Sequence, residues 1–405
     1  MPPHIAPGIL PSDEKERKIF LDFLKKQIKD HPVVKEHHGK WKEIIEWVDE
    51  GNQFSEWNED ARTVKPVTLV RRKKRLIVNL MKPLAEALES KINTTFKVVG
   101  SPNSSEQADI SAGKVSTKFI GYNDYVNSIE ALWEDFKYDL TRTGNAFFKV
   151  VFDKGKHGYA KNKDGGKVRV EGEVVMSVPS VFNMRPDPTS KNRENWKWFI
   201  EIVEMTEAEI EETFDVDFKK LKAETSETSA SKYEGMNEPE EEKDKSVNTH
   251  ILTLYWEVDS KKYPKGRHII ATGDTVLHAE ENTGCFPGKD GGIPSWHLGY
   301  HRKGNSMWHK SPMHYIQPIQ RAFNRLISII SEHIEGWRAK IVAPFGTIKK
   351  GAYTDESFEI LEIMQGSGPI HPVNTPSLGA EVPAHLDFLR SMIPEVSNVH
   401  EVSYA

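Results

Sequence analysis

The sequence has a single cysteine, Cys285, among its 405 residues. One thiol cannot form an internal disulfide, and it leaves no cysteine-based zinc site. Long apolar runs are missing too: no stretch reaches the roughly 18 apolar residues that cross a bilayer. The first residues also lack the apolar core of a signal peptide. We therefore expect a soluble, unprocessed protein without a membrane partner, in keeping with a reducing compartment.

The chain also lacks an excess of positive charge. It carries 55 Lys and Arg residues against 60 Asp and Glu residues, a formal net charge of −5. Tight binding of nucleic acid depends on cations that neutralise phosphates, so this chain is not built to bind it over its whole surface. Apolar residues make up only 37%, which suggests extended segments or surfaces that other subunits complete.

Motifs for nucleotide binding or metal catalysis are missing as well. The sequence contains neither a G-x-x-x-x-G-K-[ST] loop nor an H-E-x-x-H helix. His297 and His301 have metal-ligand spacing only if they lie on a helix, and Gly299 between them argues against one. The sequence predicts no catalytic residue, no cofactor, no metal site and no enzymatic activity.

The longest helical pattern spans residues 311–338. Ser311 and Pro312 mark its start, Gly336 marks its stop, and Pro318 predicts a kink after a short first turn. Apolar residues recur at steps of three and four, and we expect this face to pack: Ile319, Phe323, Ile327, Ile330 and Ile334. The opposite face is polar and carries Gln317, Gln320, Arg321, Asn324, Arg325 and Ser328.

Elsewhere the pattern predicts an α+β protein. Helices are expected at 12–29, 34–50 and 123–141, and a short helix at 206–212 begins with a capping box of Thr206 and Glu209. Alternating segments predict an antiparallel sheet with strands at 146–152, 167–177, 196–203, 250–258 and 267–278. Residues 224–246 are acidic and almost without apolar side chains, so we expect a loop there.

Two further segments bear on function. The densest basic run is Arg71, Arg72, Lys73, Lys74 and Arg75. It is either a solvated surface or a contact with phosphate or with an acidic neighbouring subunit. Beyond the long helix, residues 339–382 form a Gly- and Pro-rich module with short β segments at 358–364 and 368–373, and a short helix follows at 383–392. Such a module is too small to be stable alone.

Several short motifs occur in a distinctive order. They are Arg-Lys-Lys-Arg-Leu-Ile-Val-Asn-Leu-Met-Lys-Pro ending at Pro83, Arg142-Thr143-Gly144-Asn145-Ala146, Pro179-Ser180-Val181-Phe182 with Asp187-Pro188, Ser311-Pro312, and Pro318-Ile319-Gln320-x-x-x-Asn324. In this order, over roughly residues 34–405, the chain resembles the portal proteins of tailed bacteriophages. It departs from many relatives at His309-Lys310, where a glycine usually precedes Ser-Pro.

The resemblance implies a portal fold in five parts. These are a wing of helices and antiparallel sheet at 1–310, a first stem helix at 311–338, a β-containing clip at 339–382, a second stem helix at 383–395, and the start of a tunnel loop at 396–405. The family's long C-terminal helix and crown have no counterpart in these residues. Either that part was lost or the gene product continues beyond Ala405.

The resemblance also implies partners. The subunits would form a homo-oligomeric ring, commonly a dodecamer, at one vertex of the virion capsid, assembled in the host cytoplasm. Double-stranded DNA would pass through the central channel, which the polar face of the first stem helix is expected to line. The terminase large subunit, the major capsid protein and tail or adaptor proteins would bind the ring.

Two alternatives remain open. One is a phage-encoded, metal-dependent nucleic-acid enzyme whose catalytic carboxylates lie among the many Asp and Glu residues. The other is a structural head-joining protein that is not the portal. Metal-dependent nuclease activity would favour the first, and rings without a through-channel would favour the second.

Overall fold

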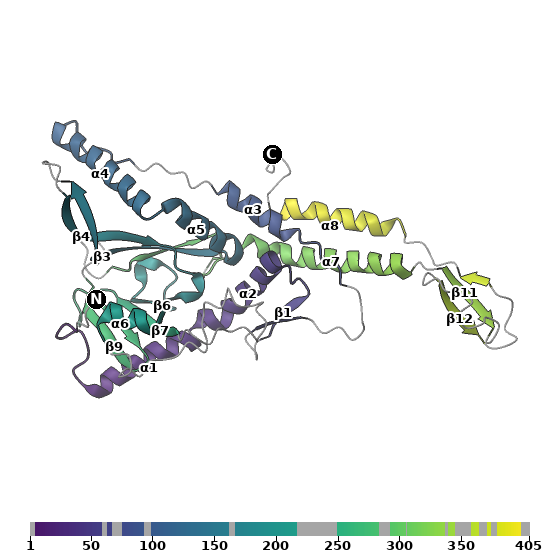
Figure 1. The fold of residues 1–405 in the computed structure, drawn as a ribbon, viewed down its shortest axis with the longest axis horizontal. Coiled ribbons are helices and arrows are strands. Elements are labelled where there is room, and N and C mark those ends of the chain that lie inside the picture. The colour runs from purple at the N-terminus through teal and green to yellow at the C-terminus, as the bar shows by residue number, and fades with distance from the viewer. Residues whose placement is uncertain are drawn as a thin grey trace. The chain divides into compact units, whose positions relative to one another are not determined.

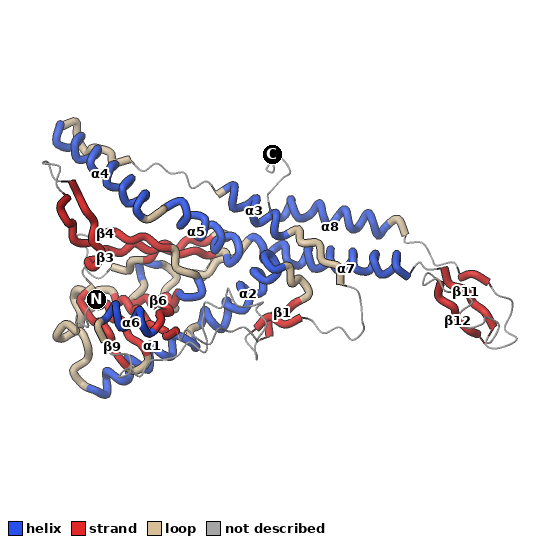
Figure 2. Tube along the Cα trace, in the orientation of Figure 1, coloured by secondary structure: helices blue, strands red, loops and turns tan. Residues whose placement is uncertain are grey.

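The computed structural model describes residues 5–58, 63–66, 75–92, 99–161, 167–216, 249–282, 292–304, 306–336, 339–344, 358–363, 371–373 and 379–397. Helices combine with mainly antiparallel sheets, which confirms the α+β class (Figures 1 and 2). The chain divides into two compact units, Met1–Lys42 with Glu89–Pro312 (unit 1) and Glu43–Leu88 with Met313–Ala405 (unit 2). Among the described residues, no helix is long and apolar enough to span a membrane.

The larger sheet of unit 1 has five antiparallel strands in sequential order: β5 (Met184–Pro186), β6 (Trp198–Thr206), β7 (Thr249–Glu257), β8 (Arg267–Thr272) and β9 (Thr275–Glu281). Both faces are covered. Ile251 and Tyr255 of β7 pack in one core with α1 (Glu14–Asp30), while Leu252 packs in another with α6 (Glu207–Phe214). The alternation along β7 follows from the two-residue period of a strand.

The bounds of α1, α6 and the 267–278 segment can be compared with those predicted from the sequence. Helix α1 matches the expected 12–29 helix, and the Asp13 side chain caps it. Helix α6 begins with the predicted capping box, in which Thr206 and Glu209 satisfy each other's backbone amides. The single strand expected at 267–278 is wrong. The chain turns at Gly273, with φ 52°, and makes the hairpin of β8 and β9.

A second sheet of unit 1 pairs β10 (Ser295–Gly299), β3 (Asn145–Lys161) and β4 (Lys167–Ser177). Helix α5 (Ile129–Thr143) packs Phe136 and Leu140 against Ala146 of β3. The helix predicted at 123–141 is wrong at its start, because the chain breaks at Ser128, with φ 50°, and α4 (Gln107–Val126) precedes it. Helix α4 buries only Gly113 and Asn123, so it lacks the buried stripe by which helices are usually recognised. Two 3-10 turns, Val181–Asn183 and Arg193–Asn195, complete the elements of unit 1.

The helix predicted at 34–50 is continuous but changes pitch. It consists of a π segment (Val34–His38), α2 (Gly39–Ile45) and a second π segment (Glu46–Glu50), and it ends at Gly51 in a left-handed conformation. The core of unit 2 joins residues of this helix's end to α3 (Met81–Lys91), α7 (Pro312–Gly336) and α8 (Glu381–Ser397). A short hairpin of β1 (Ser55–Asn58) and β2 (Thr63–Pro66) also belongs to unit 2.

Between α7 and α8 in the sequence lies a small sheet. Its central strand β11 (Ala339–Pro344) runs parallel to β12 (Phe358–Ile363) and antiparallel to β13 (His371–Val373). The predicted β segments coincide with β12 and β13. Helix α8 is longer than the predicted 383–395, and Val396 and Ser397, expected in a tunnel loop, are helical. Residues 398–405 and the expected acidic loop at 224–246 lie outside the described residues.

Candidate functional site

Helix α7 carries most of the side chains that the sequence selects. It forms one continuous helix from Pro312 to Gly336, so the separate first turn expected before Pro318 is wrong, and the kink at Pro318 stays a prediction. Pro318 itself is exposed, and a proline inside a helix removes one backbone hydrogen bond. At the start of the helix Met313 and Ile316 are fully buried against α3 and α8.

Three polar residues of α7 are buried, not open. Gln320 and Asn324 have 0% of their surface exposed and Ser328 has 7%. They stand four residues apart, on one side of the helix, and hydrogen-bond to the backbone of residues 76–80. Leu80 N donates to Gln320 Oε1 (3.3 Å), Val78 N to Asn324 Oδ1 (3.2 Å) and Leu76 N to Ser328 Oγ (3.0 Å). We call this arrangement the amide ladder.

The amide ladder keeps its register for a geometric reason. Four residues of an α-helix advance about 6 Å, and two residues of extended chain advance about 6.6 Å. Every fourth side chain of α7 therefore meets every second amide of the segment, at three successive contacts. Gln320 also donates to Val78 O (2.7 Å), so its side chain bonds the segment at both Val78 and Leu80.

A second set of amides ties the ladder to its surroundings. Asn324 donates to Gln53 Oε1 and accepts from Gln320 Nε2 (3.0 Å). Gln53 Nε2 donates to Asn79 Oδ1 (2.8 Å), and Asn79 accepts from the amides of Met81 and Lys82 at the start of α3. The prediction that Gln320, Asn324 and Ser328 lie on an open polar face is therefore wrong. Their side chains accept from backbone amides in part-buried hydrogen bonds. A buried amide left without a partner costs about 1–3 kcal/mol.

The other three predicted polar residues lie nearer the surface. Gln317 Nε2 donates to Glu43 Oε1 (2.8 Å), and Arg321 forms an ion pair with the same oxygen (3.4 Å). The Arg321 guanidinium lies 5.0 Å from the centre of the Trp47 ring. Arg325 is exposed and has no ion pair among the described residues. The predicted polar face is thus divided between a buried ladder and an exposed cationic edge.

The predicted packing residues of α7 also divide. Phe323 is buried, while Ile319, Ile327 and Ile330 are half-buried. Ile334 is 58% exposed, so its placement in a packed seam is wrong for the single chain. Period alone could not show this, because the three- and four-residue spacing is the same whether a position of the helix is covered or exposed.

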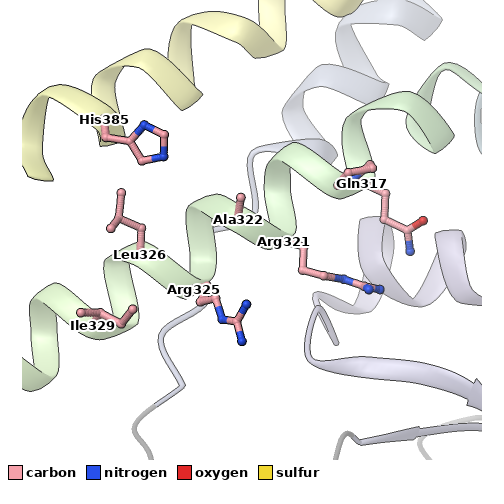
Figure 3. Close-up of a pocket in the computed structure, with 8 residues that line it drawn as sticks. Gln317, Arg321, Ala322, Arg325, Leu326, Ile329 and His385 are labelled. Carbon is pink, nitrogen blue, oxygen red and sulfur yellow. The ribbon is translucent and has the colours of Figure 1, made fainter.

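Helices α7 and α8 run antiparallel. Ile393, late in α8, shares a core with Met313 and Ile316 at the start of α7. His385, early in α8, borders a groove further along α7. This open groove has a volume of about 490 Å³, and its lining is Gln317, Pro318, Arg321, Ala322, Arg325, Leu326, Ile329 and His385. Figure 3 shows His385 above Leu326, with Arg321 and Arg325 pointing away from α8.

In unit 1, two motifs that lie far apart in the sequence are in contact: residues Arg142 to Ala146 and the segment around Ser311. Asn145 Nδ2 donates to His309 O (3.0 Å), and His309 N donates to Asn145 Oδ1 (2.9 Å). Ser311 Oγ donates to Thr141 O (2.5 Å). Gly144 has φ +78°, and a Cβ there would lie 2.3 Å from Ser311 N. We call this contact the Gly144 joint, and only glycine fits it.

An ion pair lies next to the Gly144 joint in the chain. Arg142 pairs with Glu89 and lies 4.2 Å over the Tyr138 ring. Glu89 also accepts from Thr141 Oγ1 (2.9 Å). A lone buried charge would be costly, whereas this pair is satisfied from both sides. Residues Arg142 to Ala146 and Ser311-Pro312 belong to the series of motifs found in the sequence. The sequence did not predict that these two motifs are in contact.

Three histidines of unit 1, the buried His31 and the half-buried His37 and His297, have lowered pKa values. Burial lowers the pKa of His31 to about 4, although its bond to Pro186 O (2.9 Å) opposes the shift. Burial and the nearby Lys40 lower the pKa of His37 to about 4. Burial lowers the pKa of His297 to about 3, and its ring stacks on His309. These groups are neutral at pH 7.

The structure bears in part on two further features of the sequence, the basic run at 71–75 and the pair of His297 and His301. Of the basic run 71–75, only Arg75 is described, and its guanidinium lies 5.8 Å from the Phe54 ring centre; the other four lie outside the described residues. His297 lies on strand β10, which confirms that residues 297–301 are not helical. Within the residues that the structure describes, no group of three His, Cys, Asp or Glu side chains is placed to hold a metal ion.

Comparison with known proteins finds no family model that matches the chain and no curated protein significantly similar to it. The residues and geometry above therefore carry the functional argument.

Proposed function

We propose that this chain is a portal vertex subunit of a tailed bacteriophage. Identical copies would form a ring-shaped channel through which viral DNA is packaged and ejected. The ring would also be a docking platform for the terminase and for tail or adaptor proteins. The observation that carries this proposal is the succession of α7, the small sheet β11–β13 and an antiparallel return helix α8. In the proposed ring, α7 would be the first stem helix, the small sheet the clip and α8 the second stem helix.

Exposed apolar side chains on the same elements support assembly into a ring. In α7 Ile329 is 50% exposed, and in α8 Phe388 is 56% exposed. Helix α4 adds Val115, Phe119 and Tyr125, all with more than half of their surface exposed. Large apolar side chains that gather on uncovered helices mark surfaces for other proteins. In a cyclic assembly each copy would cover part of the next.

The amide ladder supports a stem role in a second way. A wall past which DNA moves needs a helix held in one position, with few fixed cations facing the phosphates. Side-chain amides bond α7 to residues 76–80 at three points without adding charge. In the proposed ring, Gln320, Asn324 and Ser328 would hold α7 in position and would not line the channel.

Negative-stain imaging of the purified chain tests the proposal. Rings with a stain-filled central hole are expected. A chain that remains monomeric at high concentration in capsid-like salt would contradict the proposal. Rings without a through-channel would instead favour a head-joining protein. Nuclease activity that EDTA abolishes, in a sample without rings, would favour the nucleic-acid enzyme.

A further inference from the structure

The α7 groove combines positive charge with apolar surface. Arg325 is exposed without an ion pair among the described residues, and the Arg321 side chain keeps 49% of its surface exposed beside Glu43. Leu326 and Ile329 supply the apolar floor, and His385 forms the edge on the α8 side (Figure 3). A groove of this kind suits a helix that carries carboxylates around an apolar side chain.

The outward face of α8 has that composition. Leu389 and Ile393 are its buried residues. At 100° per residue, Asp387, Phe388 and Glu395 lie on the opposite side, and all three are exposed. Neither carboxylate has an ion pair among the described residues. We call Asp387, Phe388 and Glu395 the α8 stripe.

We infer that the α8 stripe of one copy docks into the α7 groove of the next copy. This inference rests on the proposed ring and specifies its contact. The stripe would place its carboxylates toward Arg321 and Arg325 and Phe388 against Ile329. The surfaces are different, as a ring requires, because a contact between unlike patches repeats from copy to copy.

The dimensions of the two surfaces are compatible. Asp387 and Glu395 are eight residues apart, or about 12 Å along a helix, and the groove extends from Gln317 to Ile329, or about 18 Å. His385 borders the groove, and its ring stacks on Phe388 with a centre-to-centre distance of 6.1 Å. The groove and the stripe of one chain therefore share an edge, so that successive contacts would form a continuous belt.

Charge reversal tests this contact. Arg321→Glu with Arg325→Glu makes the groove acidic, and Asp387→Arg with Glu395→Arg makes the stripe basic. Each double variant is expected to raise the concentration for half-maximal ring assembly by about tenfold or more, because like charges then meet. The chain with all four changes is expected to regain rings. A mixture of the two double variants is also expected to form rings, with alternating copies.

Control variants each reverse a single charge on another exposed helix face of unit 2. Lys82→Glu and Glu86→Arg on α3 should leave ring assembly within about twofold of the original chain. Rings from both double variants at the original concentration would overturn the inference while leaving the proposed function standing. Failure of the fourfold variant and of the mixture, with each chain folded by circular dichroism, would also overturn it. Absence of rings from the unmodified chain would remove both proposals.

Discussion

The two units differ in the kind of polar side chain that they pack in their interiors. Unit 1 encloses titratable groups: His31 is buried and His37 and His297 are half-buried among aromatic rings, and Arg142 pairs with Glu89 beside the Gly144 joint. Unit 2 buries side-chain amides of α7 that bond to backbone. Amides hold their hydrogen bonds at any physiological pH, whereas His31 Nδ1 can accept from Val33 N only while the ring is neutral. The difference predicts that the two units respond to different perturbations.

Acid should give the largest effect, and it should act on unit 1. An unfolded histidine has a pKa near 6.5, and in the folded chain the pKa values of His31 and His37 are lowered to about 4. The unfolded state therefore binds protons first, so stability is complete above pH 6.5 and falls as the pH drops toward 4. At pH 5 each such histidine costs about 2 kcal/mol.

Hydrogen exchange at pH 7 and pH 5, corrected for the intrinsic pH dependence, distinguishes the units. The amides of β6 and β7 should lose protection at pH 5, while those of α3 keep it. Equal loss in β7 and α3 would contradict the comparison. Replacement of His31 by Phe, which cannot be protonated, should reduce the acid effect on unit 1.

Gly144→Ala should have the next largest effect, again in unit 1. The new Cβ would meet the backbone of Lys310 and Ser311 at 2.3 Å, and φ would remain at +78°. Strain and a forced backbone shift together should lower the free energy of unfolding by about 4 kcal/mol. Gly121→Ala on α4 is the control, since nothing lies within 4 Å of its Cβ position. It should be neutral or slightly stabilising. Urea unfolding of both variants measures the difference, and equal midpoints would disprove the joint.

Asn324→Leu should act on unit 2 instead. It removes the acceptor for the part-buried Val78 N and the donor to the buried Gln53 side chain. The expected loss is about 3 kcal/mol. The amides of Leu76, Val78 and Leu80 should exchange faster in this variant. Arg325→Leu, one position along α7 and exposed, should change stability by less than about 0.5 kcal/mol. Unchanged exchange at Val78 in Asn324→Leu would show that the ladder does not form.

The smallest effect is expected at the far part of α7. Ile334 is 58% exposed, so Ile334→Ala should change the stability of the single chain by less than about 0.5 kcal/mol. Phe323→Ala, its buried counterpart, should cost about 3 kcal/mol. Thermal unfolding at concentrations below ring assembly compares the two. A large loss from Ile334→Ala would mean that the exposed end of α7 packs within its own chain.

Local rules predicted much of the fold. Helices α1 and α6, the strands around residues 146–177 and the long helix α7 follow from period and capping residues alone. Helix α4 escaped prediction because it buries almost nothing, so its apolar residues Val115 and Phe119 do not form the stripe that a core imposes. The residue pattern around α4 therefore contains no local signal from which this helix could have been predicted.

The candidate site was harder to predict. The sequence shows Gln320, Asn324 and Ser328 on the polar side of a helix, and polar side chains are usually exposed. Their burial depends on residues 76–80, about 240 positions away, whose backbone amides need partners. The spacing of four between amide and hydroxyl residues opposite an extended segment was the available indication. The joint of Gly144 with Ser311 likewise depends on tertiary contact.

Native mass spectrometry of the unmodified chain tests the central claim most directly. A portal-type ring of twelve 46.2-kDa chains should appear at about 550 kDa, and neighbouring ring sizes would appear at other whole multiples. A single species at 46.2 kDa, at protein concentrations of tens of micromolar and under capsid-like salt, would contradict the account.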